Sequence, residues 1–321
     1  MPRGPATPHA RHALPPTGAH RAPKTVRRLL RKPAVITLVL GFALAAALTA
    51  PSAQASTPIY LGSAGDSVGL SGSIGARLSD HAYAHFHGKV PVGRMITVKS
   101  SENWRTVAAA GPGSRTYNDI VRWAQTIKAR GGKVMVAYHH EPEAAGNYNR
   151  GTPAEFINAF RRVVTIFRAQ GVKNVIYTWQ MTAWSFRTKA SDTRYAAKWY
   201  PGDAYVDSVG ADAYNWYTCG HGSGRNTSFA TLADPVLAFA RAHKKPVSFP
   251  EFAMHASPAR AKWIIEAHRY FIAHRDTVHA AFYFQRGPTV AANSDCKWAL
   301  YTIADYRAYG DIARHRTYFQ P

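Results

Sequence analysis

Short apolar runs alternate with longer amphipathic runs from residue 58 to residue 313. The short runs have the length and the β-branched and aromatic content of buried strands, and the longer runs repeat their apolar residues at helical spacing. Strands are therefore predicted at 58–63, 82–86, 94–100, 134–138, 175–179, 206–213, 247–250 and 280–284. Helices are predicted at 117–130, 152–167, 228–243, 258–274 and 297–313.

Strands and helices that alternate along one chain predict a parallel sheet covered by helices. Eight strands with no left-over segment predict that this sheet closes into a single (β/α)8 TIM barrel of the α/β class. The alternative is an open, doubly wound sheet. That fold carries a glycine-rich phosphate-binding turn after its first strand, and the spacing of Gly62, Gly65 and Gly69 does not match such a turn.

The first 55 residues differ in composition from the rest of the chain. They contain eight Lys or Arg residues, no Asp or Glu, an apolar run at 34–50 and the tripeptide Ala53-Gln54-Ala55. These are the features of a secretory signal peptide, so residues 1–55 are predicted to be one, with cleavage after Ala55. The alternative is an uncleaved membrane anchor, because an apolar run of this length lies at the lower limit of a span of about 17 to 25 residues.

Cleavage would leave residues 56–321 as one domain, close to the roughly 250 residues typical of a (β/α)8 barrel. These 266 residues keep 32 of the 40 basic residues and all 18 acidic ones, which gives a net charge of +14. The basic residues are dispersed and no nucleic-acid-binding motif is present, so nucleic acid is not an expected partner. We expect a secreted monomer without a stable membrane anchor, whose charge favours loose association with anionic cell surfaces.

The usual metal-binding residue types are sparse. Cys219 and Cys296 are too few for a metal cluster and fit one disulfide in an oxidising compartment, so we predict a bond between the loops after the sixth and eighth strands. His139 and His140 are adjacent on a strand and should diverge, whereas zinc hydrolases place two histidines on one face of a helix. Neither a metal nor a cofactor is therefore expected.

The run 134–143, VMVAYHHEPE, carries the polar residues that such a barrel would present at its open end. Functional groups of (β/α)8 enzymes follow the carboxyl ends of the strands. Glu141 and Glu143 follow the fourth strand, and Glu251 follows the seventh, across the barrel. Two carboxyl groups that face one sugar can hydrolyse a glycosidic bond, and in the retaining form they lie about 5 to 5.5 Å apart.

Three motifs occur in order along the chain. They are His140-Glu141-Pro142 after the fourth strand, YPGDAYVDSVGADAY at 200–214, and Glu251 after the seventh strand. Together they resemble glycoside hydrolase family 26, secreted (β/α)8 enzymes that include β-mannanases, and the likeness covers nearly all of residues 56–321. The resemblance implies Glu141 as acid/base, Glu251 as nucleophile, His140 as a positioning neighbour and Tyr214 as a hydrogen-bond partner of the nucleophile.

The sequence also predicts contacts for residues in and beside these motifs. Glu143, which lies beyond Pro142, is expected to touch substrate or solvent. His139 should point toward the helix layer, because neighbouring residues of a strand face opposite sides. For His140 and Tyr214, ordinary structural roles stay open as alternatives, since buried histidines and tyrosines are commonly satisfied by local hydrogen bonds.

Aromatic residues near strand ends are candidates for stacking on sugar rings. Trp179 and Trp216 are favoured because they lie at strand ends, and Tyr148 is a third candidate. The chain departs from the mannanase pattern at 144–148 (AAGNY) and at Phe284-Gln285, where the resemblance leads one to expect tryptophan. These departures leave the catalytic pair in place and leave mannan specificity open.

The resulting hypothesis is a secreted retaining glycosidase that cleaves a β-linked polysaccharide, β-mannan or a related β-glycan, by double displacement without a cofactor. The alternative is a non-catalytic barrel that binds carbohydrate or cell-wall polymer through its positive surface. That alternative predicts salt-sensitive adhesion and no turnover.

Overall fold

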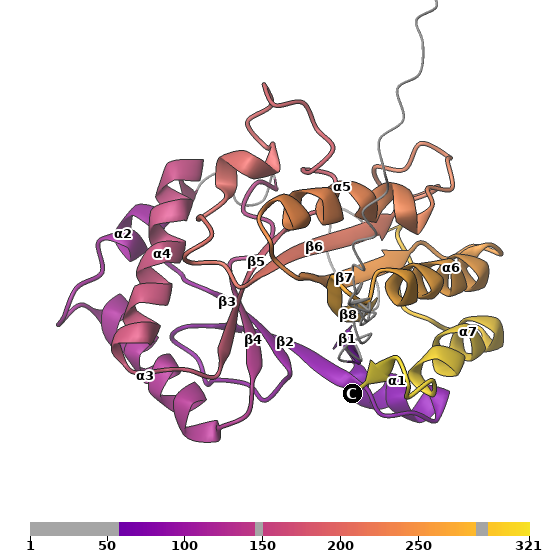
Figure 1. The fold of residues 1–321 in the computed structure, drawn as a ribbon, viewed down its shortest axis with the longest axis horizontal. Coiled ribbons are helices and arrows are strands. Elements are labelled where there is room, and N and C mark those ends of the chain that lie inside the picture. The colour runs from indigo at the N-terminus through magenta and orange to yellow at the C-terminus, as the bar shows by residue number, and fades with distance from the viewer. Residues whose placement is uncertain (1–57, 145–149, 287–294) are drawn as a thin grey trace, which may run out of the picture. The chain divides into compact units, whose positions relative to one another are not determined.

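The computed structural model describes residues 58–144, 150–286 and 295–321 (Figure 1). The predicted signal peptide, residues 1–55, and the predicted sugar platform Tyr148 lie outside these residues. Within the described part of the chain, no helix is long and apolar enough to cross a lipid bilayer.

Eight parallel strands form the centre of the fold and close on themselves. Each strand pairs with the next along the chain, and β1 pairs with both β2 and β8. The predicted (β/α)8 barrel is therefore confirmed. A short additional strand, β9 (Phe319–Gln320), pairs with the start of β1. The barrel strands are β1 (Ile59–Gly65), β2 (Ser79–His85), β3 (Met95–Lys99), β4 (Val134–Tyr138), β5 (Val175–Thr182), β6 (Ser208–Asn215), β7 (Val247–Met254) and β8 (Val278–Gln285).

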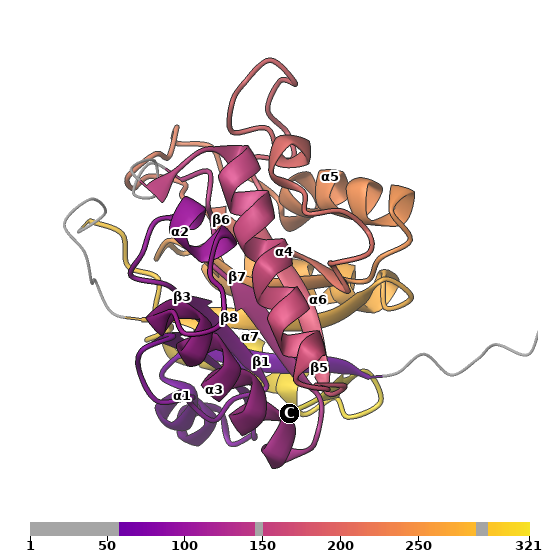
Figure 2. The same cartoon turned by 90° about the vertical axis from the view of Figure 1, so that its left-hand side faces the viewer.

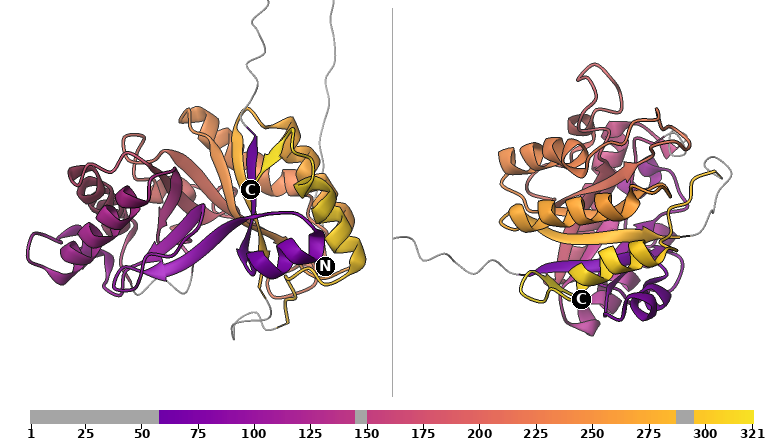
Figure 3. Two further views of the ribbon diagram at one scale, coloured as in Figure 1. Left: turned by 90° about the horizontal axis from the view of Figure 1, so that it is seen from below. Right: turned by 90° about the vertical axis from the view of Figure 1, so that its right-hand side faces the viewer.

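Helices cover the outside of the barrel, and Figure 2 looks onto the side where α3 and α4 lie. Helix α3 packs beside α4, and α5, α6 and α7 follow one another around the other side (Figure 3). The helical elements are α1 (Ser67–Ile74), α2 (Trp104–Ala108), α3 (Arg115–Arg130), α4 (Pro153–Ala169), the 3-10 turn η2 (Ala196–Trp199), α5 (Phe229–Ala242), α6 (Arg260–Ala273) and α7 (Ile303–Ala313).

The structure adds elements that the apolar pattern did not reveal. Helix α1 has the sequence SVGLSGSI, which is too rich in small polar residues to show a helical stripe. It begins because the Asp66 carboxylate accepts a hydrogen bond from the Gly69 backbone N–H at 2.7 Å. Strands β5 to β8 also run past their predicted ends. Glu251 consequently lies within β7, although the sequence pattern placed it after that strand.

The two faces of the strands pack differently. The inner face holds a small cluster composed of Ala64, Met95, Met135, Ala137, Ala280 and Phe282. The outer face belongs to a much larger core shared with the helices, in which Tyr138 of β4 stacks on Phe156 of α4. This inner cluster fills part of the barrel interior with apolar side chains, and the charged residues Lys99, Asp212 and Glu251 lie toward the carboxyl ends of their strands.

Gly62 of β1 shows how tightly the inside of the barrel is packed. A Cβ atom added there would lie 2.4 Å from the Phe282 ring and 2.5 Å from the Ser79 carbonyl oxygen. By contrast, a Cβ atom at Gly72, on the exposed side of α1, would have no neighbour within 4 Å.

We therefore expect Gly62→Ala to lower the free energy of unfolding by about 1 to 3 kcal/mol, the usual cost of overpacking a core. Gly72→Ala is the matched control and should raise it by up to about 1 kcal/mol, because alanine favours the helix. Urea titration of both variants measures the two changes. An unchanged or more stable Gly62→Ala protein would contradict this packing of the barrel.

Candidate active site

A sharp turn follows β4 and aims three residues in different directions. His139 and Glu141 adopt left-handed backbone conformations, with φ of 51° and 48°. Such conformations cost energy in residues with a side chain, so they persist only where the surroundings hold them. Here the His139 N–H donates to the Val98 carbonyl at 2.9 Å, and the Glu141 N–H donates to the Gln180 carbonyl at 3.0 Å. Strands β3 and β5 thus hold the turn from both sides.

The turn separates the two histidines as predicted. The His139 ring packs against Trp104 of α2, with 5.9 Å between ring centroids, and lies in the helix layer. The His140 ring packs against Tyr83 of β2 at 5.8 Å, on the inner side. Simple alternation does not explain this result. Ala137 belongs to the inner cluster, so a regular strand would also turn His139 inward, and the left-handed backbone at His139 reverses the direction.

Glu251 is held through both of its carboxylate oxygens. The Tyr83 hydroxyl donates to Oε1 at 2.6 Å, and the Tyr214 hydroxyl donates to Oε2 at 2.5 Å. The side chain is 5% exposed, so these bonds replace most of its contact with water. The contact with Tyr214 is the one that the sequence resemblance implied. The contact with Tyr83 was not foreseen, because β2 has a weak strand pattern.

A row of hydrogen bonds across the barrel supports the site from below. The His81 Nδ1 atom lies 2.8 Å from the Pro250 carbonyl, which can only accept, so Nδ1 carries a proton. The His81 Nε2 atom lies 2.8 Å from the Thr97 hydroxyl, which donates to Gln180 Oε1 at 2.9 Å. The Gln180 amide in turn donates to both oxygens of Asp212 at 2.9 Å. Strands β2, β3, β5 and β6 are thereby linked through their inward side chains.

Asp212 connects this row to the two glutamates. Its backbone pairs directly with Glu251 at an irregular point in the register between β6 and β7. Its carboxyl group also makes a side-chain hydrogen bond with Glu141. Burial raises the pKa of Asp212 well above its usual value, and the charges of Glu251 and Glu141 raise it further. The pairing places the three carboxyl groups in one buried site.

The surroundings push Glu141 and Glu251 toward different protonation states. Burial raises the pKa of Glu141 to about 8, and the charges of Glu251 and Glu143 add to the rise. Burial also raises the pKa of Glu251, but the hydrogen bonds from Tyr214 and Tyr83 oppose that rise by stabilising its ionised form. At neutral pH Glu141 is therefore the group suited to hold a proton, and Glu251 is the group equipped to carry a negative charge.

Glu143 does not reach solvent, which was one of the two contacts predicted for it. It is 1% exposed, and its Oε1 atom accepts hydrogen bonds from the Thr182 backbone N–H at 2.8 Å and the Thr182 hydroxyl at 2.7 Å. Burial raises its pKa to about 7, although these bonds oppose the rise. Glu143 therefore ties the turn after β4 to the end of β5.

The predicted sugar platforms lie in different places. Trp179 is fully buried between β5 and α5, with ring contacts to Tyr200 at 4.9 Å and Phe239 at 5.5 Å. It has no face open to a sugar, so its prediction does not hold. Trp216 is partly exposed, and its ring lies 6.1 Å from Tyr214. It remains a candidate platform at the edge of the site.

The predicted disulfide is present. Cys219 and Cys296 are bonded, with their Cα atoms 5.3 Å apart, and the bond joins the segments that follow β6 and β8. The two sulfurs and a ring nitrogen of His255 form the one group of possible metal ligands found in the described part of the chain. Because the sulfurs are bonded to each other, that group offers only the histidine, which does not make a metal site.

Comparison with known proteins identifies the family. The model of glycosyl hydrolase family 26 matches residues 103–270, slightly more than half of the chain. The chain belongs to glycosyl hydrolase family 26. A curated relative is endoglucanase H from Acetivibrio thermocellus, which is 31% identical over 189 residues. That match covers 56% of this chain and 20% of the relative, so the chain spans about a fifth of the length of that protein.

Solved structures of this family share the fold. The catalytic domain of a GH26 endo-β-1,4-mannanase from Bacillus sp. JAMB-750 aligns with a TM-score of 0.54 and 14% identity, covering 83% of this chain and 88% of that chain. A GH26 β-mannanase from Bacteroides ovatus aligns with a TM-score of 0.53 and the same identity and coverage. At this identity the likeness concerns the barrel architecture.

We expect the burial of Glu143 to make stability depend on pH. Its folded pKa, about 7, lies above its ordinary value of 4.5, so its contribution is fully present below pH 4.5 and is lost as the pH rises through 7. The free energy of unfolding should therefore fall with pH less steeply in Glu143→Gln than in the unmodified protein, by up to about 1.4 kcal/mol per pH unit. Urea unfolding of both proteins between pH 4.5 and 8 measures the difference. Curves that stay parallel across this range would contradict the raised pKa.

Proposed function

We propose that this family 26 protein is a secreted retaining glycosidase that cleaves a β-linked polysaccharide with Glu251 as nucleophile and Glu141 as acid/base. The observation that carries the proposal is the contrast between the two glutamates. Glu251 receives two tyrosine hydrogen bonds, whereas Glu141 shares the same buried site with its pKa raised to about 8. A retaining mechanism needs this division between an ionised and a protonated carboxyl group.

The reaction follows from these states in two steps. In the first, Glu251 attacks the anomeric carbon while Glu141 donates its proton to the departing glycosidic oxygen. A covalent glycosyl-enzyme results, and Glu141 is left ionised. In the second step, Glu141 removes a proton from water, which attacks the same carbon and releases Glu251. No cofactor is required.

Several neighbours have defined parts in this scheme. Tyr83 and Tyr214 keep the nucleophile oriented and ionised through their hydroxyl groups. His140 packs edge-on against Tyr83, and burial holds its pKa well below the usual value, so it is neutral at neutral pH. A neutral ring supports Tyr83 without adding a charge beside the carboxylates.

The substrate is proposed to be a β-linked polysaccharide of the mannan or glucan type. The relatives carry the names endoglucanase and endo-β-1,4-mannanase, which together point to β-linked hexose polymers. The departures from the mannanase pattern at 144–148 and at Phe284 leave both sugars as candidates. Assays with β-mannan, mixed-linkage β-glucan and xylan, followed by sizing of the products, distinguish them.

Removal of either glutamate should abolish most of the activity. We expect Glu251→Ala to lower kcat by at least about 10⁴-fold, and Glu141→Ala to lower it by about 10² to 10⁴-fold, the usual contribution of general acid/base catalysis. Hydrolysis of the preferred polysaccharide by purified variants measures both losses. The loss for Glu141→Ala should shrink on an aryl β-glycoside, because a good leaving group needs no proton.

Glu266→Ala is the matched control for this experiment. Glu266 lies on the outer helix α6, where its partner is Lys262 at 4.0 Å, and its removal should leave kcat unchanged. Full activity in both Glu141→Ala and Glu251→Ala would overturn the proposal. Salt-sensitive binding of polysaccharide without turnover in the unmodified protein would favour the non-catalytic barrel instead.

The pH dependence of kcat/KM should reveal Glu141. Activity requires protonated Glu141, so it should fall as the pH rises through about 8, where burial places the pKa of this group. The charge of Lys99, at the end of β3, lowers the pKa of Glu141. Lys99→Met should therefore move the basic limb to higher pH, whereas Lys262→Met on α6 should not move it. A basic limb that stays in place or moves to lower pH in Lys99→Met would contradict the assignment.

A further inference from the structure

Trp298 packs against Tyr214, whose hydroxyl donates to the proposed nucleophile Glu251. Trp298 itself lies in a segment without regular secondary structure. Its ring meets Tyr214 at 4.8 Å and 64°, and Trp216 at 5.1 Å and 86°, both edge-to-face. Tyr214 also contacts Phe284, but at 5.6 Å. Trp298 is 7% exposed, so its ring is largely enclosed by these neighbours. Of the ring contacts to Tyr214 in the described part of the chain, that with Trp298 has the shortest centroid distance.

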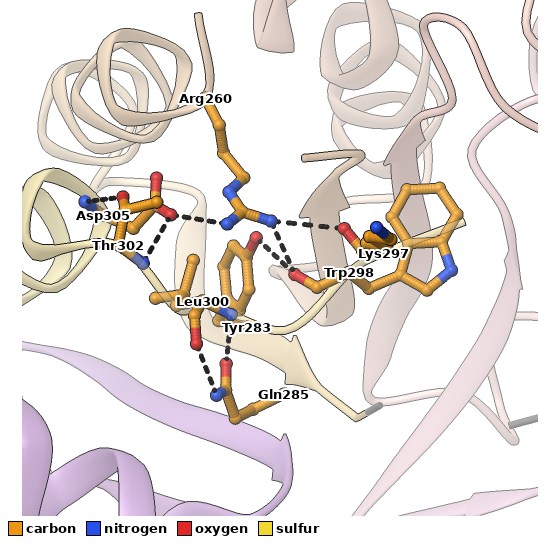
Figure 4. Close-up of polar contacts among 8 residues, drawn as sticks. All are labelled: Arg260, Tyr283, Gln285, Lys297, Trp298, Leu300, Thr302 and Asp305. Carbon is orange, nitrogen blue, oxygen red and sulfur yellow. Dashed lines mark hydrogen bonds and ion pairs between the residues drawn. The ribbon is translucent and has the colours of Figure 1, made fainter. Parts of the chain in front are cut away.

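The backbone of Trp298 is fixed by groups from the barrel and from α6 (Figure 4). The Tyr283 hydroxyl donates to the Trp298 carbonyl at 3.0 Å. The Arg260 guanidinium donates to the carbonyls of Lys297 at 3.2 Å and Trp298 at 3.4 Å. Arg260 is itself 1% exposed and forms a buried ion pair with Asp305 of α7 at 2.5 Å. One buried guanidinium thus links α6, α7 and the backbone of Lys297 and Trp298.

Two further contacts hold the segment on either side of Trp298. Upstream, the disulfide attaches Cys296 to Cys219, which follows Trp216 by three residues. Downstream, the backbone of Leu300 exchanges two hydrogen bonds with the Gln285 side chain, at 2.9 and 3.3 Å. The segment that carries the indole is consequently restrained by a covalent bond on one side and by hydrogen bonds on the other.

We propose that Trp298 is a positioning residue for the proposed nucleophile: its indole keeps Tyr214 in the orientation that donates to Glu251, and the Cys219–Cys296 bond keeps the indole there. The inference rests on the proposed function, because it takes Glu251 as the nucleophile. A tyrosine hydroxyl stabilises a carboxylate only while it points at the carboxylate oxygen, since hydrogen bonds weaken steeply with misalignment. Packing against the ring is what limits that motion.

A positioning role for Trp298 affects the pKa of Glu251, whereas a sugar-stacking role does not. Without the indole, Tyr214 loses its alignment and Glu251 loses a bond that lowers its pKa. Glu251 must be ionised to attack, so the acidic limb of kcat/KM should move to higher pH. The other groups around Glu251 stay as they are: Tyr83, Lys99, Arg286, Asp212 and Glu141. A tryptophan that only binds sugar would change KM and leave this limb in place.

The test compares Trp298→Ala, Tyr214→Phe and the double variant. We expect Trp298→Ala to lower kcat about tenfold and to change KM less than about twofold. It should also move the acidic limb of kcat/KM to higher pH, as Tyr214→Phe should. The losses of the two single variants should not add in the double variant, because both act through one hydrogen bond. Trp123→Phe, which alters a fully buried tryptophan on the outer helix α3, is the control for general loss of packing.

The role of the disulfide is tested separately with the double variant Cys219→Ala/Cys296→Ala. The acidic limb should shift in the same direction as in Trp298→Ala, and an unshifted limb would remove the disulfide from the inference. A raised KM with an unmoved acidic limb in Trp298→Ala would overturn the inference as a whole. That outcome is distinct from failure of the proposed function, which appears as retained activity in Glu251→Ala.

Discussion

The crowding of four carboxyl groups at one end of the barrel is the constraint on which the site depends. Glu143, Asp212 and Glu251 are buried and Glu141 is partly buried beside them, so the four groups cannot all be ionised without a large electrostatic cost. The protein resolves this by giving each group different neighbours. Glu143 receives bonds from Thr182, Asp212 from Gln180, and Glu251 from two tyrosines. Burial raises the pKa of Glu141 to about 8, which suits an acid catalyst, and it also raises the pKa values of Asp212 and Glu143.

The fold supplies these neighbours because parallel strands end at the same rim. Small and apolar residues fill part of the barrel interior, and a continuous row of polar contacts from His81 to Asp212 lies beside them. Regular strand geometry does not suffice at one place. The turn after β4 needs left-handed backbone at His139 and Glu141, and bonds to β3 and β5 hold it. A strained turn beside the proposed acid/base is consistent with strain being concentrated at functional sites.

Much of this arrangement could be predicted from the sequence, and the exceptions have physical reasons. Alternating strands and helices predicted the barrel, and the residue order around Glu141 and Glu251 predicted the candidate pair. Tyr83 was missed because β2 carries inward polar residues that hide the strand pattern. Trp179 was wrongly predicted to contact sugar. Its neighbours Thr178 and Gln180 take the inward positions of β5, so Trp179 faces α5 on the outside of the barrel. Trp298 has no pattern to reveal it, since only tertiary restraints place it beside Tyr214.

The central claim is that Glu251 forms a bond to the sugar. Its most direct test is a β-glycoside with fluorine at C2 and a good leaving group, because the fluorine slows both steps and the leaving group speeds the first. Incubation followed by peptide mass analysis should find the 2-fluoroglycosyl group on Glu251, with matching loss of activity. A label on another residue, or first-formed product of inverted anomeric configuration, would contradict the account.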